Sequence, residues 1–322
     1  MSHRDLEAHT TLRIGDVSDT LRHMCRLFGF RSSVLSGIHS SLVAAENALA
    51  RQSVRHPDGW GVAYYNGGFP HIIRNDKQAL DDGLFKEVSA VLSTRTLLAH
   101  IRQATVGKVG ILNCHPFQHG PWTFAHNGQI ANFGTDEDLR HRLHEAVDGR
   151  FHPQILGTTD SEVCFYLFLS RLARRVEDIY HEGIRAEVTM DALKETVEMI
   201  LEMAPEPDPR EPNRLTFLLT NGSVMAALRF RRELYLSTYK SRCPERETCH
   251  AFEASRCERE VQDGIVKHLI VTSERVSDNP NVWIELQDGD YASVDFGMNF
   301  HRGVLSSLSN RSVCQLPLAV TM

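Results

Sequence analysis

The chain has 322 residues, of which 42% are hydrophobic and 24% are charged, which is ordinary for a protein that folds around a buried core. Its 35 basic and 41 acidic residues give a net charge of −6, which argues against a nucleic-acid or anionic-membrane partner. No apolar run approaches the roughly 20 residues that span a bilayer, so we expect no membrane partner.

Residues 1–24 form a leader before the first predicted strand. The leader mixes acidic, basic and histidine residues and lacks the apolar segment of a secretory signal. We expect a mis-assigned start, a removed propeptide or a genuine extension, and we favour the first because Met24 directly precedes Cys25. The chain's seven cysteines are irregularly spaced, which favours a reducing, cytoplasmic compartment over a disulfide framework.

The predicted strands and helices follow from β-branched and aromatic content and from helical spacing of apolar residues. We expect strands at residues 25–30, 59–65, 95–102, 122–125, 214–220, 223–230, 266–272, 282–285 and 291–295, and helices at 42–52, 80–92, 136–147, 160–176 and 190–203. The strands come in hairpin-like pairs with helices between them, which favours antiparallel sheets covered by helices. Four prolines in residues 204–213 predict a loop, which we interpret as a connection within one domain.

Four polar motifs lie at or near the ends of these elements. Cys25 and Arg26 open the first strand, and the sequence HIRQAT at 100–105 ends the third. The sequences NCHPF at 113–117 and HNGQI at 126–130 flank the fourth strand, and TTDSE at 158–162 opens a helix.

Taken singly, each motif has a structural explanation. A strand cysteine such as Cys25 is most often a small buried hydrophobe. Asn127-Gly128 is typical of a hairpin turn. Arg102 fits an ion pair, and Asp160 fits the N-cap of a helix, with Thr158 or Thr159 as the alternative cap. Only the combination of the four motifs favours a functional site.

In order, residue type and spacing, the four motifs resemble the glutaminase domain of class II glutamine amidotransferases, the cysteine branch of the N-terminal-nucleophile hydrolases. The resemblance covers roughly residues 25–300, which leaves 1–24 as the leader and 301–322 as a C-terminal tail. The sequences HPDGWG at 56–61 and TSER at 272–275 resemble the stand-alone members of the family, which include γ-glutamyl hydrolases. The resemblance implies an α+β fold, a four-layer αββα sandwich with two antiparallel sheets between helical layers.

The resemblance also implies how the reaction is catalysed. Cys25, as the first residue of the mature protein, attacks the γ-glutamyl carbonyl, and its own α-amine takes the thiol proton. The Asn127 amide and the Gly128 backbone N–H stabilise the resulting oxyanion.

The substrate head group is assigned in the same way. Arg102 suits the α-carboxylate, because a guanidinium binds that group through two parallel hydrogen bonds. Asp160 suits the α-ammonium. Thr105 and Trp60 are expected to line the same pocket. The partner is thus a small-molecule substrate, and the chemistry calls for no cofactor.

Two clusters contain residues that commonly bind metals. His100, His115 and His126 are expected to form hydrogen bonds behind the site. Cys243, Cys249 and Cys257 miss the short spacing of a zinc knuckle, so we expect them to lie in a solvated loop. No metal is assigned.

The leading hypothesis is hydrolysis of the γ-glutamyl amide bond of glutamine or a γ-glutamyl compound through a γ-glutamyl thioester. One alternative is a glutaminase subunit that passes ammonia to a separate synthase. Another is a catalytically silent relative used for binding or assembly, which a retained leader would favour. No synthase-sized region follows the glutaminase-like one, and we favour hydrolysis because no acceptor site or channel can be read from the sequence. A protein partner and a homo-oligomer stay open.

Overall fold

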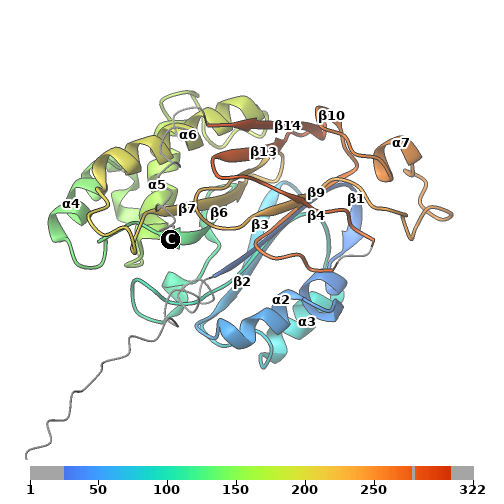
Figure 1. Cartoon of the computed structure of the whole chain (residues 1–322), viewed down its shortest axis with the longest axis horizontal. Coiled ribbons are helices and arrows are strands. Elements are labelled where there is room, and N and C mark those ends of the chain that lie inside the picture. Colours follow the sequence, from blue (N-terminus) through green and yellow to red (C-terminus); the bar gives the residue numbers. More distant parts are fainter. Residues whose placement is uncertain (1–24, 278–279, 306–322) are drawn as a thin grey trace, which may run out of the picture.

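A computed structural model describes residues 25–277 and 280–305, and the leader lies outside these residues. Two antiparallel sheets of seven strands pack face to face. Helices α2 and α3 cover the outer face of one sheet, and α4, α5 and α6 cover the other (Figure 1). The predicted four-layer αββα sandwich is confirmed.

The first sheet carries the start of the described chain at its centre. Its strand order is β12-β9-β11-β1-β4-β2-β3, with β1 paired to both β11 and β4. The strands are β1 (Arg26–Gly37), β2 (Trp60–Asn66), β3 (Phe69–Asn75), β4 (Ser93–Ile101), β9 (Tyr235–Ser237), β11 (His268–Thr272) and β12 (Ile284–Glu285).

The second sheet has the order β10-β14-β13-β8-β7-β6-β5. Its strand β6 carries the HNG motif and pairs with β7. The strands are β5 (Phe117–His119), β6 (Trp122–Gln129), β7 (Arg214–Thr220), β8 (Met225–Leu228), β10 (Gly264–Ile265), β13 (Asp290–Val294) and β14 (Asn299–Val304).

The helices begin at side-chain caps where the sequence supplies them. Asp82, Asp136 and Thr159 each accept a hydrogen bond from the first turn of α3, α4 and α5. Among helices within the described ranges, none has the length and apolarity to cross a membrane. The α-helices are α2 (Leu49–Gln52), α3 (Gly83–Val91), α4 (Glu137–Glu145), α5 (Asp160–Leu172), α6 (Ala186–Met203) and α7 (Ala254–Cys257), and shorter π and 3-10 turns are η1 (Ser40–Ala44), η2 (Ser53–Arg55), η3 (Ile111–Asn113) and η4 (Gly149–Gln154).

The central strands are buried on both faces, which fixes the layers. Successive side chains of a strand point to opposite faces. Leu27 therefore packs between the sheets while Phe28 packs under α2 and α3. In the second sheet Leu218 faces the first sheet and Phe217 faces the other helices. Each such side chain contributes about 1.5–3 kcal/mol of burial free energy.

The predicted helix at 42–52 is wrong in its middle. Ala45 and Ala48 adopt extended backbone conformations, which separates η1 from α2. Between them the Asn47 amide donates to the Arg275 carbonyl at 2.9 Å, and its backbone N–H donates to the Val276 carbonyl at 3.1 Å. These tertiary bonds replace the helical ones that local spacing predicts.

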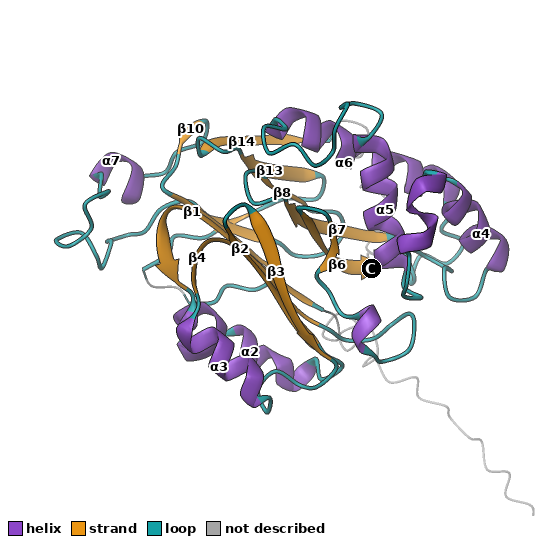
Figure 2. Ribbon diagram, turned by 180° about the vertical axis from the view of Figure 1, so that it is seen from behind, coloured by secondary structure: helices purple, strands orange, loops and turns teal. Residues whose placement is uncertain are grey.

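Several short or peripheral strands escape the sequence pattern, among them β3, β5, β9, β10 and β14. β3 forms the edge of the first sheet (Figure 2). Its second residue is Pro70, which lacks an N–H and is tolerated at a sheet edge. Such strands form because a neighbouring strand offers backbone partners, which local composition does not reveal.

Candidate active site

Cys25 lies directly before β1, between the ends of β4 and β11. Its Sγ lies 3.3 Å from the Gln103 backbone nitrogen and 3.4 Å from the Gln103 carbonyl oxygen. Burial raises the pKa of the Cys25 thiol, while the hydrogen bond from Gln103 and the nearby Arg102 charge lower it in part. The resting thiol is therefore neutral, and it needs a base before it can act as a nucleophile.

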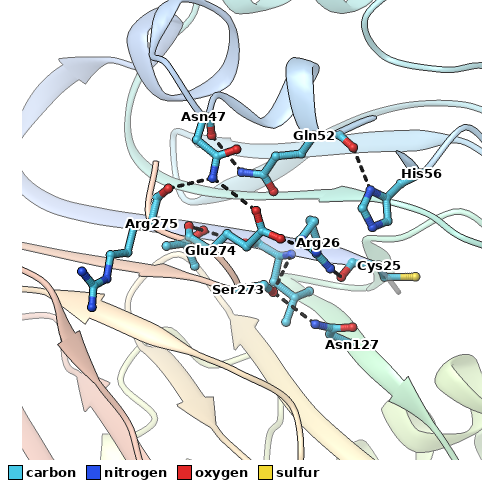
Figure 3. Close-up of polar contacts among 11 residues, drawn as sticks. Cys25, Arg26, Asn47, Gln52, His56, Asn127, Ser273, Glu274 and Arg275 are labelled. Carbon is cyan, nitrogen blue, oxygen red and sulfur yellow. Dashed lines mark hydrogen bonds and ion pairs between the residues drawn. The ribbon is translucent and has the colours of Figure 1, made fainter. Parts of the chain in front are cut away.

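The backbone of Cys25 is held from the β11 side. Arg26 donates to the Cys25 carbonyl at 3.3 Å and forms an ion pair with Glu274 (Figure 3). Glu274 also accepts a hydrogen bond from the Asn47 amide at 3.2 Å. The irregular segment around Asn47 thus helps to fix the residues beside Cys25.

Asn127 reaches the nucleophile's strand from the second sheet. Its side chain is 3% exposed, and its Nδ2 donates to Ser273 Oγ at 3.2 Å. The same Oγ accepts from the backbone N–H of Leu27 at 3.0 Å (Figure 3). Two hydrogen bonds therefore connect the amide proposed for the oxyanion hole with the strand that follows Cys25.

Asn127-Gly128 does not form the hairpin turn that the dipeptide alone suggests. Both residues lie inside β6, opposite Thr216 and Leu215 of β7. Gly128 has a φ of +154°, and a Cβ there would lie 1.9 Å from the Arg214 carbonyl oxygen. Only glycine fits this position.

Arg102 is buried at the end of β4 and organises the loop that follows it. Its guanidinium donates to the Val106 carbonyl at 3.1 Å and to the Lys108 carbonyl at 3.2 Å. A guanidinium has more N–H donors than these two bonds use, so capacity for a carboxylate is left. Thr105 lies exposed in the same loop.

Asp160 is a buried carboxyl at the start of α5, although it is not the helix cap. Thr159 fills that position, since its hydroxyl accepts from the Glu162 N–H at 3.3 Å. The Asp160 carboxyl accepts from the backbone N–H groups of Ile130 at 2.7 Å and Ser161 at 2.9 Å. Burial raises the pKa of Asp160, and the nearby His126 lowers it in part.

Asn113 connects the Arg102 loop with the start of α5, a role that sequence reasoning missed. Its Nδ2 donates to the Lys108 carbonyl at 2.9 Å, and its Oδ1 accepts from the Thr158 N–H at 2.8 Å. Gly107 packs at the same junction with a φ of +75°, where a Cβ would lie 2.8 Å from Thr158 Oγ1. In the sequence, the signal for this role was limited to the position of Asn113 at the start of the NCHPF motif at 113–117.

Trp60 does not line this site, which corrects the sequence-based expectation. Its side chain is fully buried on the helix-facing side of the first sheet, edge-on to Phe85 at 5.0 Å. The indole N–H donates to Asp82 Oδ2 at 2.9 Å. Trp60 pairs with Ile101 in register, so strand alternation points its ring into the helical layer.

The three histidines behind the site do not behave alike. His126 lies 2.9 Å from Ser161 Oγ and 2.8 Å from the Arg214 carbonyl oxygen, as expected of a hydrogen-bonding residue. The rings of His100 and His115 instead lie 4.1 Å apart, and the His115 nitrogens have no hydrogen-bond partner among the described residues. The expectation of hydrogen bonding is wrong for His115, whereas a backbone hydrogen bond with His126 raises the pKa of His100 in part. Burial lowers the pKa of each ring so that both stay neutral.

The three cysteines of residues 243–257 line a cavity of about 320 Å³ beside β1 and β11. Cys243 and Cys257 are buried, and Cys249 is half-buried. Within residues 25–277 and 280–305, no group of three or more His, Cys, Asp or Glu is placed to hold a metal ion. The loop covers the first sheet and lies outside the Cys25 site.

A family model described as class-II glutamine amidotransferases matches residues 24–315. The chain belongs to the class II glutamine amidotransferase family. The match begins one residue before Cys25, so the family resemblance starts at the nucleophile proposed here.

Curated relatives of this amidotransferase chain include "Probable glutamine amidotransferase DUG3" of Saccharomyces cerevisiae, which is 28% identical over 64% of this chain and 64% of its own length. The γ-glutamyl-hercynylcysteine sulfoxide hydrolase of Mycobacterium tuberculosis is 33% identical over 33% of this chain and 50% of its own. The chain spans 64% of the length of the yeast relative, 42% of that of a relative from Methanocaldococcus jannaschii and 56% of that of a relative from Escherichia coli.

Solved structures show the same fold. A glutamine aminotransferase class-II domain protein from Silicibacter pomeroyi aligns with a TM-score of 0.57 at 19% identity, over 87% of this chain and 98% of that one. The glutamine phosphoribosylpyrophosphate amidotransferase of B. subtilis aligns with a TM-score of 0.54 at 15% identity, over 87% of this chain and 49% of that one. At these identities the likeness shows the amidotransferase fold alone.

Proposed function

We propose that this protein is a cysteine N-terminal-nucleophile amidohydrolase that cleaves the γ-glutamyl amide bond of glutamine or of a γ-glutamyl compound. The observation that carries the proposal is the position of Cys25. Its buried thiol lies at the start of the central strand, and two hydrogen bonds through Ser273 connect that strand with the Asn127 amide. Family membership supports the same reaction class.

The chemistry starts with a neutral thiol, because burial raises the pKa of Cys25. Once residues 1–24 are absent, the α-amine of Cys25 takes the thiol proton as sulfur attacks the γ-carbonyl carbon. Asn127 Nδ2 and the Gly128 N–H donate to the oxyanion. The intermediate collapses to a γ-glutamyl thioester, and the leaving nitrogen takes the proton from the α-amine. Water then cleaves the thioester and releases glutamate.

The substrate's amino-acid head group binds on the β4 side of Cys25. Arg102 there binds the α-carboxylate, and Asp160 binds the α-ammonium. Asn113 supports this pairing, because it connects the loop held by Arg102 with the segment that leads into Asp160. Two buried, opposite charges in one hydrogen-bonded unit suit a zwitterion, and Thr105 in the same loop borders the pocket.

We favour hydrolysis over ammonia transfer to a partner. A relative that is 33% identical over 116 residues is named as a hydrolase of a γ-glutamyl compound. A substrate of this class has an amine part larger than ammonia, and water is the acceptor. We place the reaction in the cytoplasm, where a nucleophilic thiol stays reduced.

Two forms of the protein test the proposal. One form begins at Cys25 and the other retains residues 1–24, and each is verified by intact mass. Both are offered glutamine, γ-glutamyl amides and γ-glutamyl peptides, and glutamate release is measured. We expect activity only from the form with a free Cys25 amine. Equal activity of both forms would contradict the role of the α-amine, and no activity from either would contradict the proposed function.

A further inference from the structure

We propose that Ser273 is a positioning residue for the reaction: its hydroxyl orients the Asn127 amide toward the oxyanion and sets that amide's place relative to the nucleophile's strand. This inference rests on the proposed function, since it assigns to Asn127 an oxyanion to stabilise. Ser273 itself contacts neither the thiol nor the scissile carbonyl in this scheme.

The geometry is compact. Ser273 follows the last residue of β11 and is 2% exposed. Its Oγ accepts from the Leu27 N–H at 3.0 Å and from Asn127 Nδ2 at 3.2 Å (Figure 3). One oxygen atom thus contacts both sheets, at a point two residues from Cys25.

The hydrogen bond decides which end of the amide is available to substrate. The Nδ2 of an asparagine carries two N–H bonds, so one can donate to Ser273 while the other is left for the oxyanion. Asn127 Oδ1 is buried without a hydrogen-bond partner among the described residues. Rotation of the amide by half a turn would bury both N–H bonds at that position, where they would lack an acceptor among the same residues, which is unfavourable. Ser273 therefore favours the orientation that presents an N–H to the reaction.

A donor fixed in advance is worth more than one that must rotate during the reaction, because no reorganisation accompanies the developing charge. Loss of the Ser273 hydroxyl leaves the Asn127 amide free to turn. Part of the benefit of Asn127 should then be lost, with substrate affinity unaffected, because the hydroxyl of Ser273 bonds Leu27 and Asn127 and neither Arg102 nor Asp160.

The neighbouring Thr272 provides a matched control. It is 1% exposed, and its hydroxyl oxygen lies within hydrogen-bond distance of the Leu27 carbonyl at 3.1 Å and the Glu274 carbonyl at 2.8 Å, which share its single O–H donor. Thr272 thus contacts the backbone of the same residue, Leu27, and neither contact of its hydroxyl reaches Asn127. A variant that lacks the Thr272 hydroxyl measures how kcat changes when only this contact between β11 and β1 is weakened.

The experiment is a pair of double-mutant cycles on the form that begins at Cys25. Ser273→Ala and Thr272→Val are each made alone and together with Asn127→Ala, and kcat, KM and melting temperature are measured on the best substrate of the screen. We expect Ser273→Ala to lower kcat about tenfold, a fraction of what removing an oxyanion-hole donor costs, with KM within about twofold. In the Asn127→Ala background the same change should lower kcat less than about twofold, because there is no amide left to orient.

The control cycle should be additive, so that Thr272→Val has the same fold-effect on kcat with and without Asn127. Equal fold-effects of Ser273→Ala in both backgrounds, or a change confined to KM, would overturn the inference and leave Ser273 a structural residue. If Ser273→Ala does not fold, Ser273→Cys, with its weaker acceptor, enters the same cycle and faces the same criterion. A wild-type protein inactive on every γ-glutamyl compound would instead refute the proposed function, whereas an active wild type with additive cycles refutes this inference alone.

Discussion

The two sides of Cys25 in the first sheet are built differently. On the β4 side, the buried charge of Arg102 lies in a loop that Asn113 joins to the segment leading into Asp160 at the start of α5. On the β11 side, next to the Arg26–Glu274 ion pair, the hydroxyl of Ser273 and the amide of Asn127 are neutral dipoles. The first side can hold a charged head group, and the second can polarise a carbonyl.

This difference separates binding from chemistry. Groups that contact the substrate equally in the ground and transition states act on KM, whereas groups that act only on the developing oxyanion act on kcat. Changes on the β4 side should therefore raise KM, and changes on the β11 side should lower kcat. Variants on each side test whether KM and kcat change separately.

The largest effect is expected where the two sides meet. Cys25→Ala removes the nucleophile, so glutamate release should fall to the background rate of the assay. The side chain it removes is small and only loosely hydrogen-bonded, so the melting temperature should change little. Substrate binding, measured by calorimetry, should persist, because Arg102 and Asp160 are unchanged. Retention of most of the activity would show that the nucleophile lies elsewhere.

Asn127→Ala tests the β11 side directly. Removal of one oxyanion-hole donor should lower kcat by about 10²–10³-fold, with KM little changed. Steady-state kinetics on the form that begins at Cys25 measure both constants. Asn127→Asp is the matched variant of nearly equal size: a carboxylate repels the oxyanion, so its kcat should be no higher. A rise in KM without a fall in kcat would break the division between the two sides.

Arg102→Ala tests the β4 side. Loss of a charge-assisted pair worth about 1.5–3 kcal/mol should raise KM by roughly 10–100-fold, with a smaller effect on kcat. Arg102→Lys keeps the charge without the planar fork, so it should recover only part of the affinity. A fall in kcat equal to that of Asn127→Ala would place Arg102 on the chemical side of the site.

The pH dependence of KM tests Asp160. Burial raises the pKa of its carboxyl, and only the ionised form attracts an ammonium. As the pH falls through that raised pKa, the carboxyl is protonated and KM should rise, at a higher pH than for an ordinary aspartate of pKa about 3.9. Asp160→Asn should raise KM about tenfold at neutral pH, the loss expected from one charge-assisted contact, and should abolish this pH dependence. A pH profile identical in the variant would exclude Asp160 as the ammonium ligand.

The β4 side could largely be predicted from sequence, because its residues lie in contiguous motifs at the ends of strongly patterned elements. HIRQAT ends a strand whose last six residues are buried, and TTDSE opens a helix with a threonine cap. The order and types of these motifs carry the family resemblance that implies roles for Arg102 and Asp160. Trp60 was assigned to the wrong face of its strand. Successive side chains of a strand point to opposite faces, so a residue close to the site along the strand can still point away from it.

On the β11 side, Asn127 lies in the HNGQI motif, but its connection to Ser273 could not be predicted in the same way. The bonds of Ser273 join residues separated by 246 and 146 positions, and no local pattern encodes such pairs. The segment around Asn47 was predicted as helix for the same reason, since its partners are in residues 274–276. Long-range polar contacts on irregular backbone are therefore found from the three-dimensional structure and not from local sequence patterns.

Asn113→Ala gives the smallest expected effect, and it tests whether the two sides of Cys25 act independently. Asn113 is not proposed to contact substrate, but its amide bonds Lys108 and Thr158 together. Loss of these bonds should loosen the relative placement of Arg102 and Asp160 and raise KM about threefold to tenfold, the loss expected from about one neutral hydrogen bond, with kcat preserved. Combined with Arg102→Ala, the change should be less than additive, because the loop has then lost the group it positions. If Asn113→Ala lowered kcat instead, the two sides of Cys25 would be mechanically coupled, and binding and chemistry would not be divided between them.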